Sequence, residues 1–203
     1  MENNNEAPKM NDNKKITNFL FEVGILAHTP RSGFHFLGTG QQTVAEHINR
    51  TCYIGYALGM MDGTVDLSKI LQMCLFHDIS ETRISDLNYV HQKYVERKET
   101  EANQDIADSV PFGDKISQAI DEYHKRESKE SIIVKDADNL EFIISLKEQV
   151  DTGNVRALSW LKPAIKRLIT VNAQNIAEEI MNTDSNDWWF DQSSPWWVNR
   201  NQK

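Results

Sequence analysis

Apolar residues recur at helical spacing along most of this chain, and no segment shows the alternation of apolar and polar residues that is typical of a β-strand. In the first such segment, Ile16, Phe19, Leu20, Val23 and Leu26 fall on one face of a helix. Polar loops separate this segment from several others with the same spacing. The pattern therefore predicts an all-α domain of about six or seven helices.

The boundaries of these helices follow from caps and helix breakers. Thr43 and Glu46 match the capping box, in which each side chain binds a free backbone N–H at the start of a helix. Ser68 is expected to cap the next helix. We expect helices over residues 14–27, from 43 onward, from 68 through His77 and Asp78 to just before Asp86, 92–108, 114–126, 131–150 and 155–181. Residues 14–182 then form one domain, with a disordered polar tail at 1–13 and a tryptophan-rich tail at 183–203.

Composition narrows the class of protein. The chain has 203 residues and a formal net charge of -8, which argues against a broad nucleic-acid-binding surface. No apolar run approaches the ~20 residues of a membrane span, and the N-terminus lacks the apolar stretch of a signal peptide. Cys52 and Cys74 lie in apolar helical patterns and are expected to be small buried hydrophobes. These features predict a cytoplasmic protein without membrane or nucleic-acid partners.

Ionisable residues interrupt the apolar helices at a few positions. His77 and Asp78 follow the apolar run LQMCLF, and Glu81 is expected to share their helix face. Asp86 comes just past the expected end of that helix, and His47 interrupts the apolar stripe of the helix before it. Burying such groups is costly without compensation. Imidazole and carboxylate ligands suit zinc, iron, manganese or cobalt, so the pattern indicates a metal site.

Each of these positions also has a structural interpretation. A single histidine on an apolar face, such as His47, is more often a hydrogen-bonded core residue than a ligand. In the run VKDADNLEF, Asp136 competes with Asp138 as a ligand, although Asp136 could be a solvated helix residue paired with Lys135. The other four histidines fit a metal site less well, and among them His35 is the best candidate to line a pocket.

Three segments carry a resemblance to a known family. TVAEH, FHDISE and VKDADNLEF resemble the ligand-bearing segments of the HD-domain metal-dependent phosphohydrolases. The spacing, and the RSG segment before TVAEH, are similar to the small bacterial and archaeal branch that contains 5'-deoxynucleotidases. The resemblance covers about residues 16–150. It implies that four residues bind the metal: His47, His77, Asp78 and Asp138. It also implies that Glu81 and Asp86 assist catalysis and that Arg31 binds the substrate phosphate.

The sequence departs from that branch beside Arg31. The branch often has tryptophan directly after this arginine, whereas Ser32 and Gly33 follow it here. Phe34 or His35 could supply an aromatic wall instead. The preference for a 2'-deoxy sugar therefore stays open. Judged from its position alone, Arg31 would more often form a salt bridge within its loop.

The resemblance implies metal-dependent hydrolysis of a phosphate monoester, with a nucleoside 5'-monophosphate as the expected substrate and manganese, cobalt, iron or zinc as the expected metal. The alternatives are a phosphodiesterase, a nucleotide pyrophosphate hydrolase, or a non-catalytic nucleotide or metal sensor on the same fold. A homodimer is also expected. Trp188, Trp189, Trp196 and Trp197 of the tail would then pack in the core or a dimer interface, or form a lid over the substrate.

Overall fold

The computed structural model describes residues 10–198. Of the tail predicted to be disordered at 1–13, residues 1–9 lie outside the described residues, and the prediction is wrong for residues 10–13, which are helical. Within residues 10–198 the regular secondary structure is helical, with loops between the helices, and β-pairing is confined to an isolated bridge between Pro30 and Thr43. The all-α prediction is confirmed. The helices are α1 (Met10–Val23), η1 (Gly24–Ala27), α2 (Phe34–Leu37), α3 (Val44–Asp62), α4 (Leu67–Phe76), α5 (Glu81–Ile84), η2 (His91–Lys93), α6 (Glu99–Asp108), α7 (Gly113–Lys125), α8 (Lys129–Asp151), α9 (Val155–Ile165), α10 (Val171–Asn182) and α11 (Pro195–Val198).

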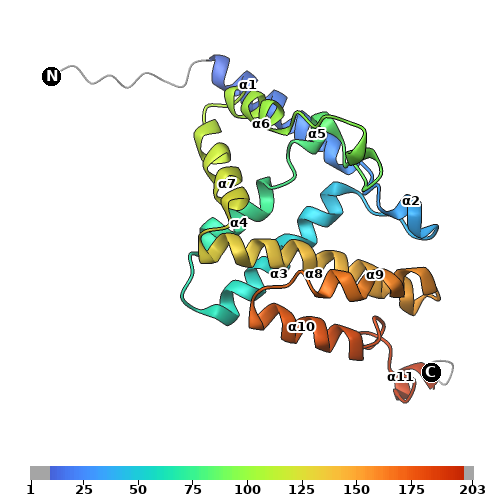
Figure 1. Cartoon of the computed structure of the whole chain (residues 1–203). Coiled ribbons are helices and arrows are strands. Elements are labelled where there is room, and N and C mark those ends of the chain that lie inside the picture. The colour runs from blue at the N-terminus through green and yellow to red at the C-terminus, as the bar shows by residue number, and fades with distance from the viewer. Residues whose placement is uncertain (1–9, 199–203) are drawn as a thin grey trace.

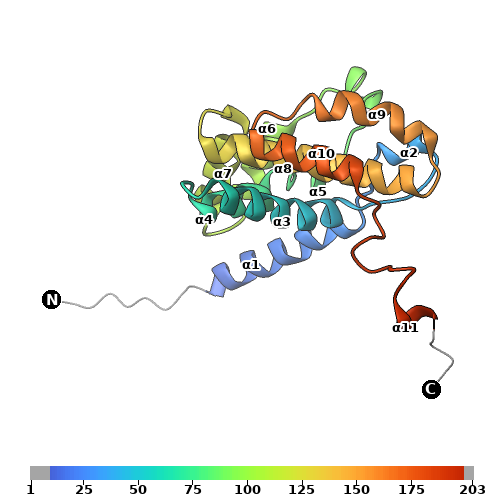
Figure 2. The same cartoon turned by 90° about the horizontal axis from the view of Figure 1, so that it is seen from below.

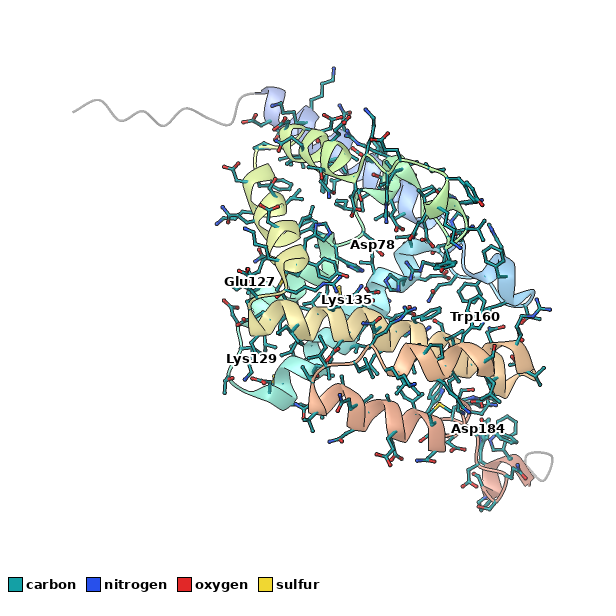
Figure 3. The ribbon with its side chains drawn as sticks, in the orientation of Figure 1. Asp78, Glu127, Lys129, Lys135, Trp160 and Asp184 are labelled. Atoms are coloured by element: carbon teal, nitrogen blue, oxygen red, sulfur yellow. The ribbon has the colours of Figure 1, made fainter. Side chains whose placement is uncertain are left out.

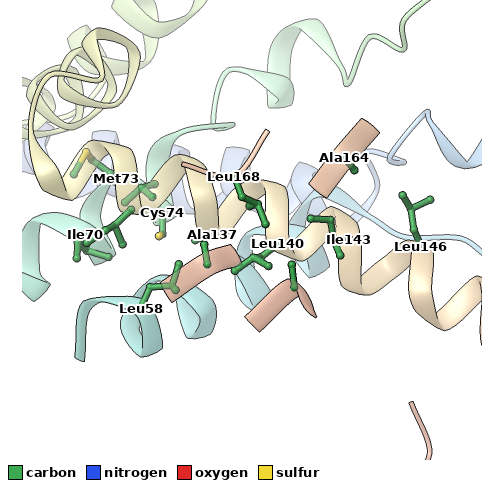
Figure 4. Packing of buried hydrophobic residues seen from close by; sticks show 14 of the residues in the cluster. Leu58, Ile70, Met73, Cys74, Ala137, Leu140, Ile143, Leu146, Ala164 and Leu168 are labelled. Atoms are coloured by element: carbon green, nitrogen blue, oxygen red, sulfur yellow. The ribbon is translucent and has the colours of Figure 1, made fainter. Parts of the chain in front are cut away.

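Helix α8 is the central element of the fold (Figure 1). It contacts α3, α4, α7, α9 and α10, and apolar residues all around it are buried, as expected for an interior helix. The main core forms where these helices meet, and Figure 4 shows Ala137, Leu140 and Ile143 of α8 within it. Because α8 is enclosed on several sides, a polar side chain on it must find a partner on a neighbouring helix.

Helices α3 and α4 pack closely at Gly55. A Cβ atom at this position would lie 2.6 Å from Cys74 Sγ, so a larger residue would push the two helices apart. Cys52 and Cys74 are free thiols, with Cys74 buried and Cys52 partly buried. The capping box of Thr43 and Glu46 is present at the start of α3, as predicted. The close packing brings the beginning of α3 beside the end of α4.

Several predicted boundaries are wrong. Helix α1 begins at Met10, four residues earlier than predicted, and Leu20 on its expected apolar face is exposed. Asp66 caps α4 in place of Ser68, because its side chain accepts hydrogen bonds from two free N–H groups of the first turn. The predicted helix over 92–108 is shortened to α6. Before it the chain turns at Asn88, whose side chain accepts from the backbone N–H groups of Val90 and His91.

The last predicted helix, over 155–181, is two helices. The break lies where Asp136 of α8 accepts hydrogen bonds from the N–H groups of Ile169 and Thr170 and from the Thr170 hydroxyl. Thr170 then caps α10. This division brings the helices of ten or more residues among those described to eight, one more than the seven ranges predicted.

The segment after α10 extends away from the helical body (Figure 2). Trp188 and Trp196 are 86% and 60% exposed, so they are not core residues, and the tail rings contact one another. Lys147 of α8 binds the carbonyl oxygen of Thr183, where this segment begins. Between residues 10 and 198, no helix has both the length and the apolar character needed to cross a bilayer.

Candidate active site

Two buried histidines face each other between α3 and the end of α4. His47 lies in the first turns of α3, and His77 follows α4 directly. Their Nε2 atoms are 3.3 Å apart, and both side chains are excluded from solvent. The predicted helix does not continue through His77 and Asp78. The carbonyl of Cys74 would accept from Asp78 N–H in a continuing α-helix, but it accepts instead from His77 Nδ1 at 2.9 Å.

Two aspartates complete the cluster. Asp78 Oδ2 lies 3.3 Å from His77 Nε2 and 3.5 Å from His47 Nε2. Asp138 Oδ1, from α8, lies 3.3 Å from His47 Nε2. His47, His77 and Asp78 each offer a ligand atom, and these atoms all lie within 4.8 Å of one another. The structure thus brings together the four residues that the resemblance implies as ligands.

The outer nitrogens of both imidazoles are already engaged. His47 Nδ1 lies 2.6 Å from Glu141 Oε2, and His77 Nδ1 lies 2.9 Å from the Cys74 carbonyl. A proton on each Nδ1 satisfies these acceptors and leaves the two Nε2 lone pairs facing each other, with the Asp78 carboxylate beside both and the Asp138 carboxylate beside His47. Two imidazole lone pairs and two carboxylates repel one another at these distances unless a positive charge lies between them. The donor set therefore fits a divalent metal ion.

The electrostatics of the cluster favour a positive charge. Burial disfavours the charged form of His77, but the charges of Asp78 and Asp138 outweigh it and raise the pKa of His77 to about 9. Burial likewise opposes ionisation of Asp78, yet His77, His47 and Arg31 hold its pKa well below its usual range. The carboxylates therefore stay ionised and available as ligands.

Glu141 is a buried partner of His47 to which the sequence analysis assigned no role. Its Oε1 accepts from Gln42 Nε2 at 2.6 Å and from Arg50 Nε at 2.9 Å, while Oε2 holds His47. Burial raises the pKa of Glu141, but the hydrogen bond to His47 and the charge of Arg50 lower it to about 2. A carboxylate behind a ligating histidine fixes its ring and tautomer. The signal in the sequence was a charged residue three positions after Asp138 in an apolar helix.

Asp138 is held on its other side by two residues that were also missed as partners. Its Oδ2 accepts from Lys135 Nζ at 2.6 Å and from the Tyr123 hydroxyl at 2.9 Å. Lys135 therefore pairs with Asp138, and the expectation of a solvated Asp136 paired with Lys135 is wrong. Asp136 is fully buried and accepts from the backbone N–H of Thr170, the residue that caps α10. The structure places Asp138, and not Asp136, beside His47.

Glu81 is buried next to the cluster at the start of α5. Its Oε1 lies 3.4 Å from Arg97 Nη2, and Oε2 has no hydrogen-bond partner among the described residues. Burial and the charges of Asp78 and Asp86 raise the pKa of Glu81 to about 9. An unpartnered buried carboxyl oxygen is uncommon and points to a group that acts on a ligand.

Arg31 and Asp86 lie together on the outer side of the cluster. Arg31 Nη1 is 3.4 Å from Asp78 Oδ2, and Arg31 Nε is 4.0 Å from Asp86 Oδ2. The same Asp86 oxygen accepts from the backbone N–H of Ser32 at 2.8 Å, so it anchors the loop that carries Arg31. Ser85, just before Asp86, has φ 63° and ψ 164°, a region that residues other than glycine rarely adopt. This strained residue directs Asp86 toward the loop.

A cavity of about 790 Å³ opens beside these groups, within the size range of small-molecule sites. Asp78, Lys135 and Trp160 lie around the space between α5 and the α8–α9 pair (Figure 3). Phe34 lines this cavity, but His35 does not, and His124 lines it instead. The predicted place of His35 is therefore wrong. Cationic side chains that line the cavity supply local attraction for an anion: Arg31, Arg97, Arg126, Lys135 and Arg167.

This geometry agrees with the comparison to known proteins. The HD domain family matches residues 23–181, which contain all four clustered histidines and aspartates. The chain belongs to the HD domain family. A 5'-deoxynucleotidase of Danio rerio is 29% identical to it over 136 residues, which are 64% of this chain and 67% of the relative. A 5'-deoxynucleotidase of Klebsiella pneumoniae is 30% identical over 128 residues, 56% of this chain and 63% of the relative.

The chain thus spans about two thirds of the length of these relatives. Among solved structures, a conserved hypothetical protein of Pyrococcus furiosus has 26% sequence identity and a TM-score of 0.71, over 82% of this chain and 99% of the other. The helical bundle is therefore an HD domain. The resemblance to the phosphohydrolase family, drawn from three short segments, is confirmed along most of the chain.

Proposed function

We propose that this HD domain hydrolyses phosphate monoesters in a metal-dependent reaction, with nucleoside 5'-monophosphates as substrates. The observation that carries the proposal is the convergence of the His47 and His77 Nε2 atoms with the carboxylates of Asp78 and Asp138 beside a cavity that Arg31 lines. The relatives named as 5'-deoxynucleotidases support a nucleotide substrate.

We assign the four clustered residues as ligands of one divalent ion, with manganese, cobalt, iron or zinc as candidates, since these metals accept mixed nitrogen and oxygen ligands. The chemistry that such an ion supplies is activation of water and polarisation of a phosphoryl oxygen. Burial and the charges of Asp78 and Asp86 raise the pKa of Glu81, and a bound divalent ion would offset those charges. We infer that the buried Oε2 of Glu81 would then accept a proton from the attacking water. Asp86 uses Oδ2 to hold the Arg31 loop, which leaves Oδ1 to orient the water or to protonate the leaving oxygen.

Arg31 is the proposed phosphate ligand. A terminal phosphate carries nearly two negative charges at neutral pH, and a guanidinium can bind two of its oxygens at once. Arg31 is less than one-fifth exposed, and the charges of Asp78 and Asp86 keep it ionised although burial opposes this. Its weak, long contacts with these carboxylates, at 3.4 and 4.0 Å, leave the guanidinium able to engage a substrate.

Substrate comparison tests the proposed activity. With one metal, kcat/KM should be higher for a nucleoside 5'-monophosphate than for a cyclic nucleotide or a triphosphate. The cyclic diester offers less charge to Arg31, and the triphosphate has two further phosphates beyond the one that is attached to the nucleoside. Replacing Arg31 by Ala should lower kcat/KM roughly 10- to 100-fold, as expected for a lost charge-assisted hydrogen bond, and leave bound metal unchanged. Phosphate release and metal analysis measure both quantities.

Arg83→Ala is the matched control, since Arg83 pairs with Glu22 and does not line the cavity. A clear preference for the cyclic nucleotide would make the protein a phosphodiesterase, and a preference for the triphosphate would make it a pyrophosphate hydrolase. Absence of turnover with every metal and substrate would favour a sensor. The presence of Glu81 with an unpartnered buried oxygen favours the enzyme over the sensor.

We also infer that the protein forms a homodimer. Large apolar side chains are exposed on α1, α3 and the tail: Phe21 is 75% exposed, Tyr53 72% and Trp188 86%. Solvent-exposed apolar bulk of this kind is typical of an interaction surface. Light scattering should give twice the chain mass, and Phe21→Ser should shift the equilibrium toward the monomer, whereas Val155→Ser on α9 should not. A monomer at high concentration would contradict this inference.

The free thiols Cys52 and Cys74 suit the reducing cytoplasm, which we propose as the location.

A further inference from the structure

The cavity continues past the metal-ligand cluster toward α2 and α9, and there its lining becomes aromatic. Phe34 of α2, Phe142 of α8 and Trp160 of α9 all line it. Phe142 follows Asp138 by four residues, which places it one helical turn, or about 6 Å, further along the same face of α8. Figure 3 shows Trp160 displaced in this direction from Asp78 and Lys135.

The aromatic wall formed by Phe34, Phe142 and Trp160 is held in position by the fold. All three rings are partly buried and pack against the main core cluster while also lining the cavity. The Phe142 and Trp160 ring centroids are 6.5 Å apart with an interplanar angle of 41°. Helix α2 is fastened to the start of α9, because Arg156 Nη1 donates to the Phe36 carbonyl at 2.9 Å and Asn154 Nδ2 donates to the Leu37 carbonyl at 3.1 Å. The rings therefore form a preformed surface.

We propose that Phe34, Phe142 and Trp160 form a subsite that binds the nucleobase of the substrate by stacking and apolar contact. This inference rests on the proposed function, since a phosphate held by Arg31 and the metal-ligand cluster fixes where the base can lie. A pentose spans the one helical turn that separates Asp138 from Phe142. A flat, partly apolar base is the ligand chemistry that aromatic walls bind best, and such stacking tolerates any base.

The polar groups near this wall explain why it should bind bases without distinguishing them through hydrogen bonds to their edges. Gln42 Nε2 already donates to Glu141 and Ser145. Asn139 Nδ2 already donates to the Lys135 carbonyl. Both N–H groups of Gln42 and one of the two N–H groups of Asn139 are thus used within the fold, which leaves few amide donors for a base edge. We expect purine and pyrimidine nucleosides to bind within roughly tenfold of each other, and a sugar without a base to bind much more weakly.

Calorimetry on the full metal-loaded chain tests the subsite with ligands that are not hydrolysed: 2'-deoxyadenosine, thymidine and 2-deoxyribose. Both nucleosides should bind at least roughly tenfold more tightly than the sugar. Phe142→Leu and Trp160→Leu should each weaken nucleoside binding roughly 5- to 100-fold. Trp188→Leu, in the exposed tail, is the matched control and should change nothing. Circular dichroism identifies any variant that fails to fold. If one of the Phe142 and Trp160 variants does not fold, the other is sufficient to test the subsite.

The same samples separate failure of the subsite from failure of the proposed activity. Phosphate release is measured from 2'-deoxyadenosine 5'-monophosphate and from 2-deoxyribose 5-phosphate. Loss of their difference in kcat/KM in the Phe142 or Trp160 variant supports the subsite. Equal binding of nucleoside and sugar, no measurable nucleoside binding, or folded variants that bind nucleosides normally would overturn it. Nucleoside binding that depends on Trp160, without phosphate release from either ester, would overturn the hydrolase and leave the subsite.

Discussion

Replacing His77 or Asp78 by Ala is expected to remove bound metal and hydrolytic activity together. Each residue contributes a ligand atom to a cluster whose members lie within 4.8 Å of one another, so neither can be lost without opening the site. A catalytic metal supplies several kcal/mol of transition-state stabilisation, so kcat should fall at least roughly 10³-fold. Elemental analysis of the purified variants and phosphate-release assays measure the two losses.

Three further variants make this test specific. Asp78→Asn keeps the shape of the side chain while removing its charge, and it should show the same loss without the cavity that Ala leaves. Glu141→Gln should weaken metal binding only about 10- to 100-fold, because it acts through His47. His28→Ala, at an exposed histidine outside the cavity, should have no effect. Stoichiometric metal in both Ala variants would show that the ligands are assigned wrongly.

Replacing Glu81 by Ala or Gln is expected to keep the metal and remove most turnover. Glu81 is 4% exposed and lines the cavity with one carboxyl oxygen unpartnered, yet it is not one of the four clustered ligands. General acid–base groups contribute typically 10²- to 10⁴-fold, and kcat should fall by about that factor. Gln is the sharper replacement, since it preserves the volume of the side chain in a buried position.

Glu99→Gln is the matched control for this prediction. Glu99 also lines the cavity and also pairs with Arg97, but its side chain is 27% exposed and belongs to α6, away from the clustered ligands. It should retain nearly normal kcat. If the metal-loaded Glu81→Gln protein turned over substrate at the normal rate, Glu81 would have no part in the mechanism.

Helix type, and the presence of a site among the apolar helices, could be predicted because their signals are local. A helix has a period of 3.6 residues, so an apolar stripe such as that of Val44, His47, Ile48 and Thr51 identifies one face of α3 without knowledge of its neighbours. The capping box at Thr43 is equally local, since its partners are three residues apart. A buried ionisable residue on such a stripe signals a site.

Local sequence signals gave wrong or undecided predictions where a residue far away in the chain determines a helix boundary or the direction of a side chain. The apolar pattern continues through residues 155–181, and the break before Thr170 depends on Asp136, more than thirty residues earlier. The choice between Asp136 and Asp138 could not be made from the residues alone, because two carboxylates two positions apart on a buried helix differ only in what they face. The packing of α10 turns Asp136 toward Thr170, and the packing of α3 places Asp138 beside His47.

The periodicity of the sequence therefore determined the all-helical class, and its resemblance to the HD-domain family supplied the four clustered residues, with Asp138 in place of Asp136. The tertiary structure alone decided which groups hold them: Glu141 behind His47, Lys135 and Tyr123 on Asp138, and Asp86 on the Arg31 loop. It also decided which rings line the cavity. The physical reason is that periodicity and caps depend on neighbours a few residues away, whereas hydrogen-bond partners and cavity walls depend on how helices far apart in the chain pack against one another.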